Sequence, residues 1–82
     1  IAIGAVKAAI RAGLRVPQDF AVVGFDDSEN SRIIEPELTT VHIDKQLMGH
    51  IAAQKLFDMI NGEPIEEYWI DTPTRLIVRN ST

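Results

Sequence analysis

Cysteine is absent from this sequence, and aromatic residues make up only 6% of it. Without cysteine the chain has no disulfides, no thiolate metal ligands and no cysteine nucleophile. Hydrophobic runs are also short, and none approaches the roughly 18 residues that a membrane-spanning helix needs. We therefore expect neither a disulfide-stabilised scaffold nor a membrane protein.

Basic residues are also few. Eight Lys and Arg stand against twelve Asp and Glu, which gives a net charge of −4. Because phosphate binding needs clustered Lys and Arg, we do not expect this segment to bind DNA by itself. The 82 residues, 45% of them hydrophobic, have the composition of a small globular domain. The sequence opens with Ile1 inside an apparent helix, so we expect a fragment of a longer chain.

The first third of the sequence has the pattern of a helix followed by a strand. Residues 1–12 are apolar around most of a helix circumference, and Gly13 is placed to end that helix. The unbroken apolar run from Phe20 to Phe25 predicts a strand buried on both faces. A helix, a short loop and a buried strand form half of a βαβ unit, so the expected fold class is α/β.

The remainder alternates between strand and helix patterns. Leu38 to Ile43 is rich in β-branched residues and predicts a second strand. Asp44 is a suitable N-cap for a helix that runs to about Asn61. Two further strands are predicted at residues 65–70 and 76–78, separated by a turn.

Two acidic residues, Asp26 and Asp27, follow the first predicted strand. Ligands of open α/β sheets bind beyond the carboxyl ends of the strands. A carboxylate there accepts hydrogen bonds from the hydroxyls of a sugar or the ring N–H of a purine. The alternative is that both residues cap the following turn, which Ser28 is also placed to cap. The pattern alone leaves both interpretations open.

Nothing in the sequence favours catalysis or metal binding. Adjacent residues on an extended chain point to opposite faces, so Asp26 and Asp27 are not expected to act as an acid–base pair. His42 with Asp44, or His50 alone, lacks the spacing of a metal site. There is no nucleophile motif and no glycine-rich phosphate loop. We predict a protein that is not an enzyme and has no catalytic residue, metal or cofactor.

A longer, ordered set of motifs resembles one protein family. Residues 9–27 follow the pattern A-x-x-x-G-x-x-V-P-x-D-x-x-V-V-G-F-D-D. P-x-L-T-T-V follows at 36–41, I-N-G at 60–62 and L-I-V-R-x-S-T at 76–82. Together they cover nearly the whole chain and resemble the C-terminal part of the effector-binding domain of LacI/GalR transcription repressors.

This resemblance implies a periplasmic-binding-protein-like α/β fold of type I, with a ligand between two lobes. Residues 1–42 and 72–82 would belong to the C-terminal lobe and residues 43–71 to the N-terminal lobe, with a lobe crossover at His42 and Ile43. The implied function is a cytoplasmic regulator. A sugar or related metabolite would modulate its binding to operator DNA through an N-terminal helix-turn-helix outside this sequence. The alternative is a periplasmic sugar-binding protein of an uptake transporter.

The resemblance also assigns roles to individual residues. Asp26 would be the carboxylate that contacts the ligand, with Phe25 beside it, while Asp27 keeps a structural role. The first helix and the loop after Ser28 look like the family's homodimer interface. The implied interface residues are Ile3, Lys7, Ile10, Asn30, Ile33 and Ile34.

Overall fold

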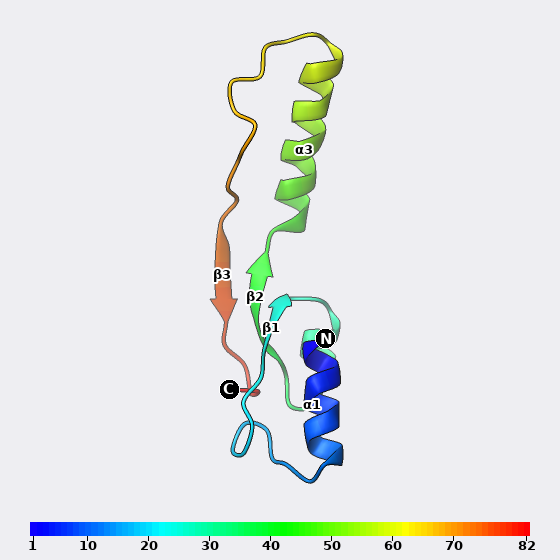
Figure 1. Ribbon diagram of the computed structural model, residues 1–82, viewed down its shortest axis with the longest axis vertical. Helices are drawn as coiled ribbons and strands as arrows, with labels where there is room; N and C mark the ends of the chain where they lie inside the picture. Colours follow the sequence, from blue (N-terminus) through cyan, green and yellow to red (C-terminus); the bar gives the residue numbers. More distant parts are fainter. The chain divides into compact units, whose positions relative to one another are not determined.

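Figure 1 shows the computed structural model, which describes all residues from 1 to 82. The chain divides into two compact units. Unit 1 comprises Ile1–His42 and Thr74–Thr82, and unit 2 comprises Ile43–Pro73. The elements in chain order are α1 (Ala2–Arg11), β1 (Val23–Asp26), α2 (Asn30–Ile33), β2 (Thr39–Ile43), α3 (Lys45–Ile60) and β3 (Thr74–Ile77).

The three strands form one sheet in the order β1-β2-β3. β1 and β2 are parallel, and their register pairs Val23 with Thr39 and Asp26 with His42. The arrow of β3 in Figure 1 points in the opposite direction, so the sheet is mixed. A helix followed by a strand that pairs in parallel with the next one confirms the predicted α/β class.

The core of unit 1 lies between α1 and the sheet. Val6, Val22 and Leu38 are its buried residues, and each is less than a tenth exposed. α1 ends as its sequence predicts, because Gly13 adopts a left-handed φ of +83° and Leu14 N–H donates to Ala9 O at 3.0 Å. This geometry is that of a glycine-terminated helix. It turns the chain back towards β1.

β1 differs from its prediction in length and burial. It begins at Val23 instead of Phe20, and the expected burial on both faces is wrong, since Val23 is 54% and Phe25 64% exposed. Side chains alternate along a strand, so Val22 and Gly24 face the core while Val23 and Phe25 face away from it. β1 is an edge strand whose inner face alone packs against α1.

Gly24 explains how closely these elements pack. A Cβ atom at this position would lie 2.7 Å from Leu38 Cδ2 and 3.2 Å from Ala2 Cβ. No real Cβ atom sits so close to another side chain, so any larger residue would push Leu38 out of place. The glycine in the V-V-G-F-D-D motif is thus a packing requirement.

Unit 2 is built on α3. Asp44 Oδ1 accepts a hydrogen bond from Leu47 N–H at 3.0 Å, which confirms the predicted N-cap. The helix ends where Gly62 takes a left-handed φ of +71°. No residue of α3 is buried. Neither α3 nor any other helix of the chain is long and apolar enough to cross a membrane.

The strand predicted at residues 65–70 does not form, and this prediction was wrong. The segment is irregular, and Tyr68 and Trp69 are 87% and 84% exposed. The reason is physical, since a strand needs a neighbouring strand for its backbone hydrogen bonds and unit 2 contains only α3 beside this segment. Trp69 Nε1–H instead donates to Asp71 Oδ1 at 3.0 Å.

Candidate functional site

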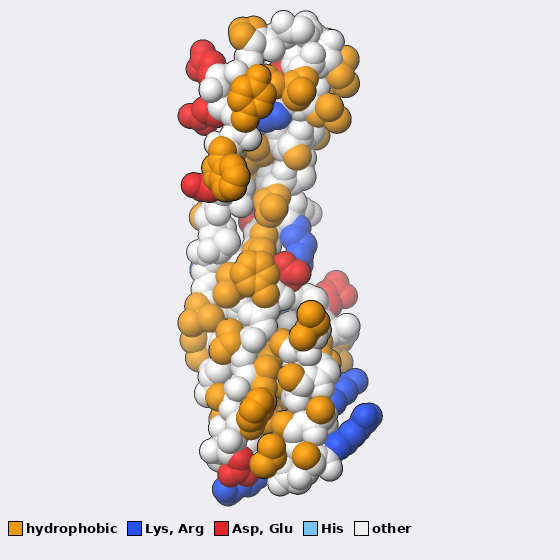
Figure 2. Space-filling model, viewed as in Figure 1, with side chains coloured by type: hydrophobic (Ala, Val, Ile, Leu, Met, Phe, Trp, Pro, Cys, Tyr) orange, Lys and Arg blue, Asp and Glu red, His pale blue; other side chains and the backbone are white.

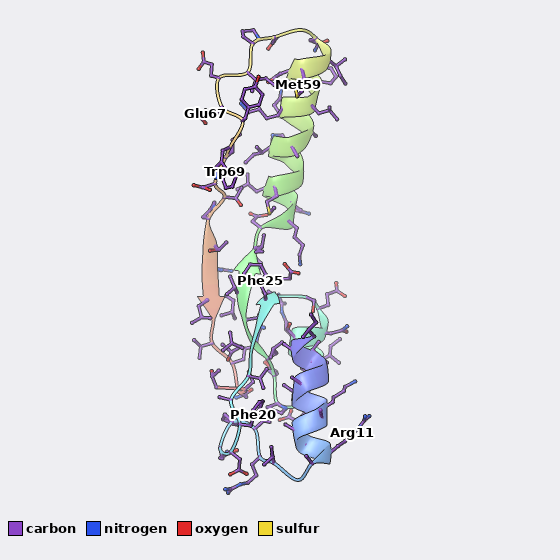
Figure 3. The ribbon with its side chains drawn as sticks, viewed as in Figure 1. Arg11, Phe20, Phe25, Met59, Glu67 and Trp69 are labelled. Carbon is purple, nitrogen blue, oxygen red and sulfur yellow. The ribbon has the colours of Figure 1, made fainter.

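The candidate site lies at the carboxyl ends of the parallel strands β1 and β2. We call the group formed by Phe25, Asp26, Asp27 and His42 the carboxyl edge. Asp26 is the last residue of β1 and is exposed, and the register places it opposite His42. Phe25, labelled in Figure 3, precedes it near the end of β1 and is also exposed. Both predicted ligand residues are therefore accessible.

The backbone of this edge is strained. Asp26 has a φ of +87° and Asp27 a φ of +50°, two consecutive left-handed residues without a glycine. Such a conformation costs an L-residue about 1 kcal/mol or more, although Asp tolerates it better than most. Residues of this kind persist only when their surroundings fix them. Asp27 makes several such contacts.

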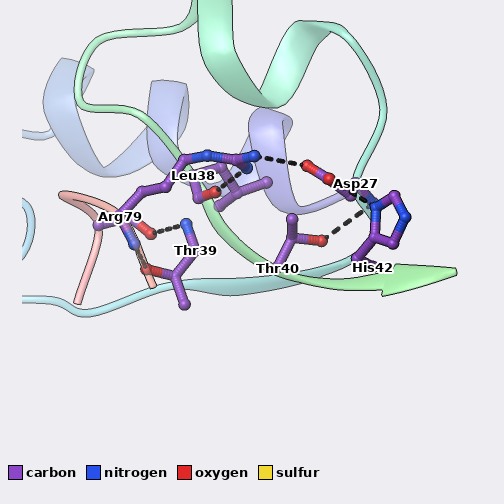
Figure 4. A network of polar contacts seen from close by, with 7 residues as sticks. Asp27, Leu38, Thr39, Thr40, His42 and Arg79 are labelled. Carbon is purple, nitrogen blue, oxygen red and sulfur yellow. Dashed lines mark hydrogen bonds and ion pairs between the residues drawn. The ribbon is translucent and has the colours of Figure 1, made fainter. Parts of the chain in front are cut away.

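Asp27 is buried and fully engaged (Figure 4). Its side chain is 3% exposed, with Oδ1 accepting from Arg79 Nη2 at 2.8 Å and Oδ2 lying 2.8 Å from His42 Nδ1. Its backbone N–H donates to Thr40 Oγ1 at 3.2 Å. We call these four residues, Asp27, Thr40, His42 and Arg79, the Asp27 clamp. Asp27 is structural, as expected, but it clamps the sheet instead of capping a turn.

Arg79 also ties the end of the chain to the sheet. Its Nη1 donates to Leu38 O at 2.8 Å and its backbone N–H to Thr39 Oγ1 at 2.9 Å. Two residues later, Ser81 Oγ donates to Val22 O at 2.6 Å and accepts from Thr39 N–H at 2.8 Å. The L-I-V-R-x-S-T motif therefore joins β1 to β2 from the far end of the sequence.

The pKa of Asp27 reflects two opposing effects. Burial raises it and is the largest single influence. The hydrogen bonds from Arg79 and His42, together with the positive charges of Arg79 and Arg32, lower it. Their sum outweighs burial, so the pKa of Asp27 lies below its usual value. The carboxylate is ionised at neutral pH, as a group that holds an arginine must be.

The short helix α2 starts differently from the prediction. Its N-cap residue is Glu29, not Ser28, and no side chain caps it. Ser28 contributes through its backbone, because its carbonyl accepts from Ser31 N–H at 2.9 Å. A single turn with this backbone contact needs no side-chain cap, so the expected role of Ser28 was wrong.

Five of the six predicted interface residues lie around one hollow in unit 1. Ile3 and Lys7 come from α1, and α2 with the residues after it supplies the other side. Ile33 is 77% exposed there. Ile10, the sixth residue, is 47% exposed and lies outside the lining. The lining residues are Ile3, Lys7, Asn30, Ile33, Ile34 and Glu35. Their contact with a second subunit stays a prediction.

The division of the chain runs through the predicted crossover. His42 is the last residue of the first stretch of unit 1 and Ile43 is the first residue of unit 2. The assignment of the two units to the lobes of a larger protein stays a prediction. No group of three or more His, Cys, Asp or Glu side chains is placed where it could hold a metal ion.

Comparison with known proteins identifies the family. The model of the periplasmic binding protein-like domain matches residues 1–82. The chain belongs to this family. The repressor PurR of Serratia proteamaculans (strain 568) is 42% identical over 81 residues, and that of Erwinia tasmaniensis is 43% identical. Both alignments cover 99% of this chain and 24% of the relative.

Solved structures agree with these relatives. The transcriptional regulator CelR in complex with cellobiose is 40% identical with a TM-score of 0.92, over 99% of this chain and 25% of that one. The Lac repressor dimer bound to operator and the anti-inducer ONPF is 36% identical with a TM-score of 0.87, over 99% of this chain and 28% of that one.

These likenesses confirm the LacI/GalR resemblance and the periplasmic-binding-protein-like fold. They concern a segment only, because the chain spans about a quarter of the length of the curated relatives it matches.

Proposed function

We propose that this chain is part of the ligand-sensing core of a LacI/GalR-type transcriptional regulator. Its effector would be a sugar or a related small metabolite that modulates operator binding by a helix-turn-helix domain outside this sequence. The family match over all 82 residues supports this proposal, as do relatives that are repressors and a similar structure that contains cellobiose. A regulator of this kind acts on DNA, so the expected location is the cytoplasm.

The observation that carries the proposal is the exposed Asp26 at the carboxyl edge. Its carboxylate has lone pairs for two donors of a sugar or a purine. Phe25, which precedes Asp26 in β1, is 64% exposed and would offer an aromatic face if its ring turns towards the ligand. Asp27 is unsuited to this role because Arg79 and His42 already occupy both of its oxygens. The engagement of Asp27 thus favours Asp26 for the ligand role that the family resemblance implies.

This role is one of binding and not of catalysis. A general acid and base would have to reach one reacting atom together. The Asp27 side chain is 3% exposed and held by Arg79 and His42, so it is not placed to exchange a proton with a substrate at Asp26. The relatives named above are repressors or regulators, and they give no support to a periplasmic transport protein.

The hollow between α1 and α2 supports a homodimer. Ile33 and Ile34 border it, and the surrounding Lys7 and Asn30 are suited to the polar rim of a two-fold interface. If this face forms the dimer, changing Ile33 and Ile34 together to Asp will shift the full-length protein to monomer in analytical ultracentrifugation. A dimer that persists would place the interface elsewhere.

Calorimetry on the full-length protein tests the ligand role. Cellobiose, ribose and adenine serve as probes for the sugar and purine classes, and Asp58→Ala on α3 is the matched control. We expect Asp26→Ala to lower the affinity for the bound probe by about tenfold or more, equivalent to about 1.4 kcal/mol. Unchanged affinity in Asp26→Ala would refute the role, and an equal loss in Asp58→Ala would show that it is not specific.

A further inference from the structure

Asp26 and Asp27 share a left-handed backbone conformation at the end of β1. The φ of +87° at Asp26 is followed by a φ of +50° at Asp27, and neither residue is a glycine. A strained pair at the end of an edge strand relaxes unless neighbouring atoms fix it. Asp27, the second residue of this pair, has a side chain that is only 3% exposed.

The Asp27 side chain is fixed from two directions. Arg79, which follows β3, donates to Oδ1 at 2.8 Å, and His42, near the end of β2, lies 2.8 Å from Oδ2. These partners are 52 and 15 residues away in the sequence. Rotating the Asp27 carboxylate would break both contacts and leave a buried charge without partners, which is strongly unfavourable. The backbone of Asp27 is therefore held at its left-handed φ.

We propose that His42 and Arg79 are positioning residues for the effector, acting on Asp26 through Asp27. The two aspartates share a peptide bond, so the clamp sets the direction in which the Asp26 side chain leaves the backbone. This inference rests on the proposed function of Asp26 as the ligand carboxylate. Neither His42 nor Arg79 needs to touch the ligand.

His42 has a second consequence through its place in the chain. It is the last residue before the chain passes into unit 2 at Ile43. The contact between His42 and Asp27 therefore links Asp26 to the point where the chain leaves unit 1.

Paired substitutions at His42 separate this role from simple packing. His42→Leu removes the ring nitrogen, whereas the amide of His42→Asn puts a donor close to the position of Nδ1. Arg79→Lys is a second test, because it keeps the charge but not the forked contact with both Asp27 and Leu38 O. His50→Asn and Arg75→Lys, at exposed positions, are the matched controls.

Two measurements on the full-length protein complete the experiment. Amide hydrogen exchange at Asp27, whose N–H donates to Thr40 Oγ1, reports the clamp without any ligand. Exchange at Thr39, which donates to Ser81 Oγ, reports the surrounding fold. Calorimetry with cellobiose, ribose and adenine reports the effector site.

We expect His42→Leu to accelerate exchange at Asp27 by about tenfold and to weaken probe binding by about fivefold. Exchange at Thr39 stays unchanged, and His42→Asn restores both properties.

Other outcomes have distinct meanings. Unchanged exchange at Asp27 in both His42→Leu and Arg79→Lys would overturn the proposal, and so would equal losses in His42→Leu and His42→Asn. Weaker binding in Asp26→Ala with full binding in His42→Leu would refute the positioning role and leave the proposed function intact. Faster exchange at Asp27 with full binding in Asp26→Ala would support the clamp and refute the proposed function. The exchange measurement decides the clamp even when none of the three probes binds.

Discussion

The two units of this chain are held together in different ways. Unit 1 buries Val6, Val22 and Leu38 and joins its strands through buried polar side chains such as Thr39 and Ser81. In unit 2, α3 buries none of its residues. Figure 2 shows hydrophobic side chains at the surface of both units. The most exposed apolar side chains of unit 2 are Leu56, Phe57, Met59, Ile60, Tyr68 and Trp69.

This difference shows what a helix pattern does and does not establish. Both α1 and α3 carry the apolar spacing of a packed helix. Only α1 meets a sheet against which its apolar side chains are buried. The stability of this chain, and the candidate site with it, therefore resides in unit 1.

The largest loss of stability is expected when the Asp27 clamp is broken. Arg79→Met leaves the Asp27 carboxylate buried without its main partner, and removing one member of a buried ion pair costs about 3–5 kcal/mol. Arg75→Met, at an exposed position of β3, is the control and should change stability by less than about 0.5 kcal/mol. Urea unfolding followed by circular dichroism measures both. A loss below about 1 kcal/mol for Arg79→Met would mean that the clamp is not a main support of unit 1.

A smaller loss is expected from truncating the core. Val6 is 0% exposed, and Val6→Ala should lower the free energy of unfolding by about 2 kcal/mol because it leaves a cavity. Leu56→Ala removes a larger side chain from α3, but this leucine is 58% exposed and the loss should stay below about 0.5 kcal/mol. The same urea titration applies. Equal losses would remove the distinction between the units.

A glycine-to-alanine substitution should change stability in opposite directions in the two units. Gly24→Ala places a Cβ 2.7 Å from Leu38 Cδ2 and should destabilise by about 1–2 kcal/mol. Gly49→Ala, in α3, meets nothing within 4 Å and should stabilise by about 0.5–1 kcal/mol through helix propensity. Thermal unfolding of the two variants provides the comparison. Destabilisation of similar size in both would show that α3 is packed more closely than described.

The smallest change in stability near neutral pH is expected from the ionisation of Asp27. The pKa of Asp27 is lower in the folded protein than in the unfolded chain, where it is about 3.9. The ionised carboxylate therefore stabilises the fold fully above the unfolded pKa, and this stabilisation is lost as the pH falls through the folded pKa. The free energy of unfolding should therefore decline on acidification, and that of the Asp27→Asn variant should decline less steeply. Urea midpoints between about pH 7 and about pH 3 measure this. Parallel profiles for the two proteins would contradict the lowered pKa.

The sequence predicted the elements with local signals well. Asp44 caps α3 and Gly13 ends α1 because each acts on backbone groups within a few residues. The strand at residues 65–70 was predicted wrongly because pairing depends on a neighbour that a local pattern does not specify. For the same reason the outer face of β1 was expected to be buried. It is exposed because the core formed with α1 lies on the opposite face of β1, where Val22 is buried.

The candidate site was predicted only in part. The place of Asp26 beyond a strand followed from the apolar run before it. The partners of Asp27 did not, because Arg79 lies 52 residues further on and no local spacing connects the two. One signal was available: a carboxylate in an apolar setting needs a cation, and an arginine stands in the terminal L-I-V-R-x-S-T motif. His42 was placed at a crossover, but its contact with Asp27 was not foreseen.

Amide hydrogen exchange on the 82-residue chain tests most directly whether unit 1 alone is self-supporting. The amides of Val22 and Thr39 donate to Ser81 and are expected to be among the slowest to exchange. Amides in the middle of α3 should exchange at least about a hundredfold faster, because none of the side chains of that helix is buried. Equal protection of α3 and the Ser81-bonded amides would contradict the account.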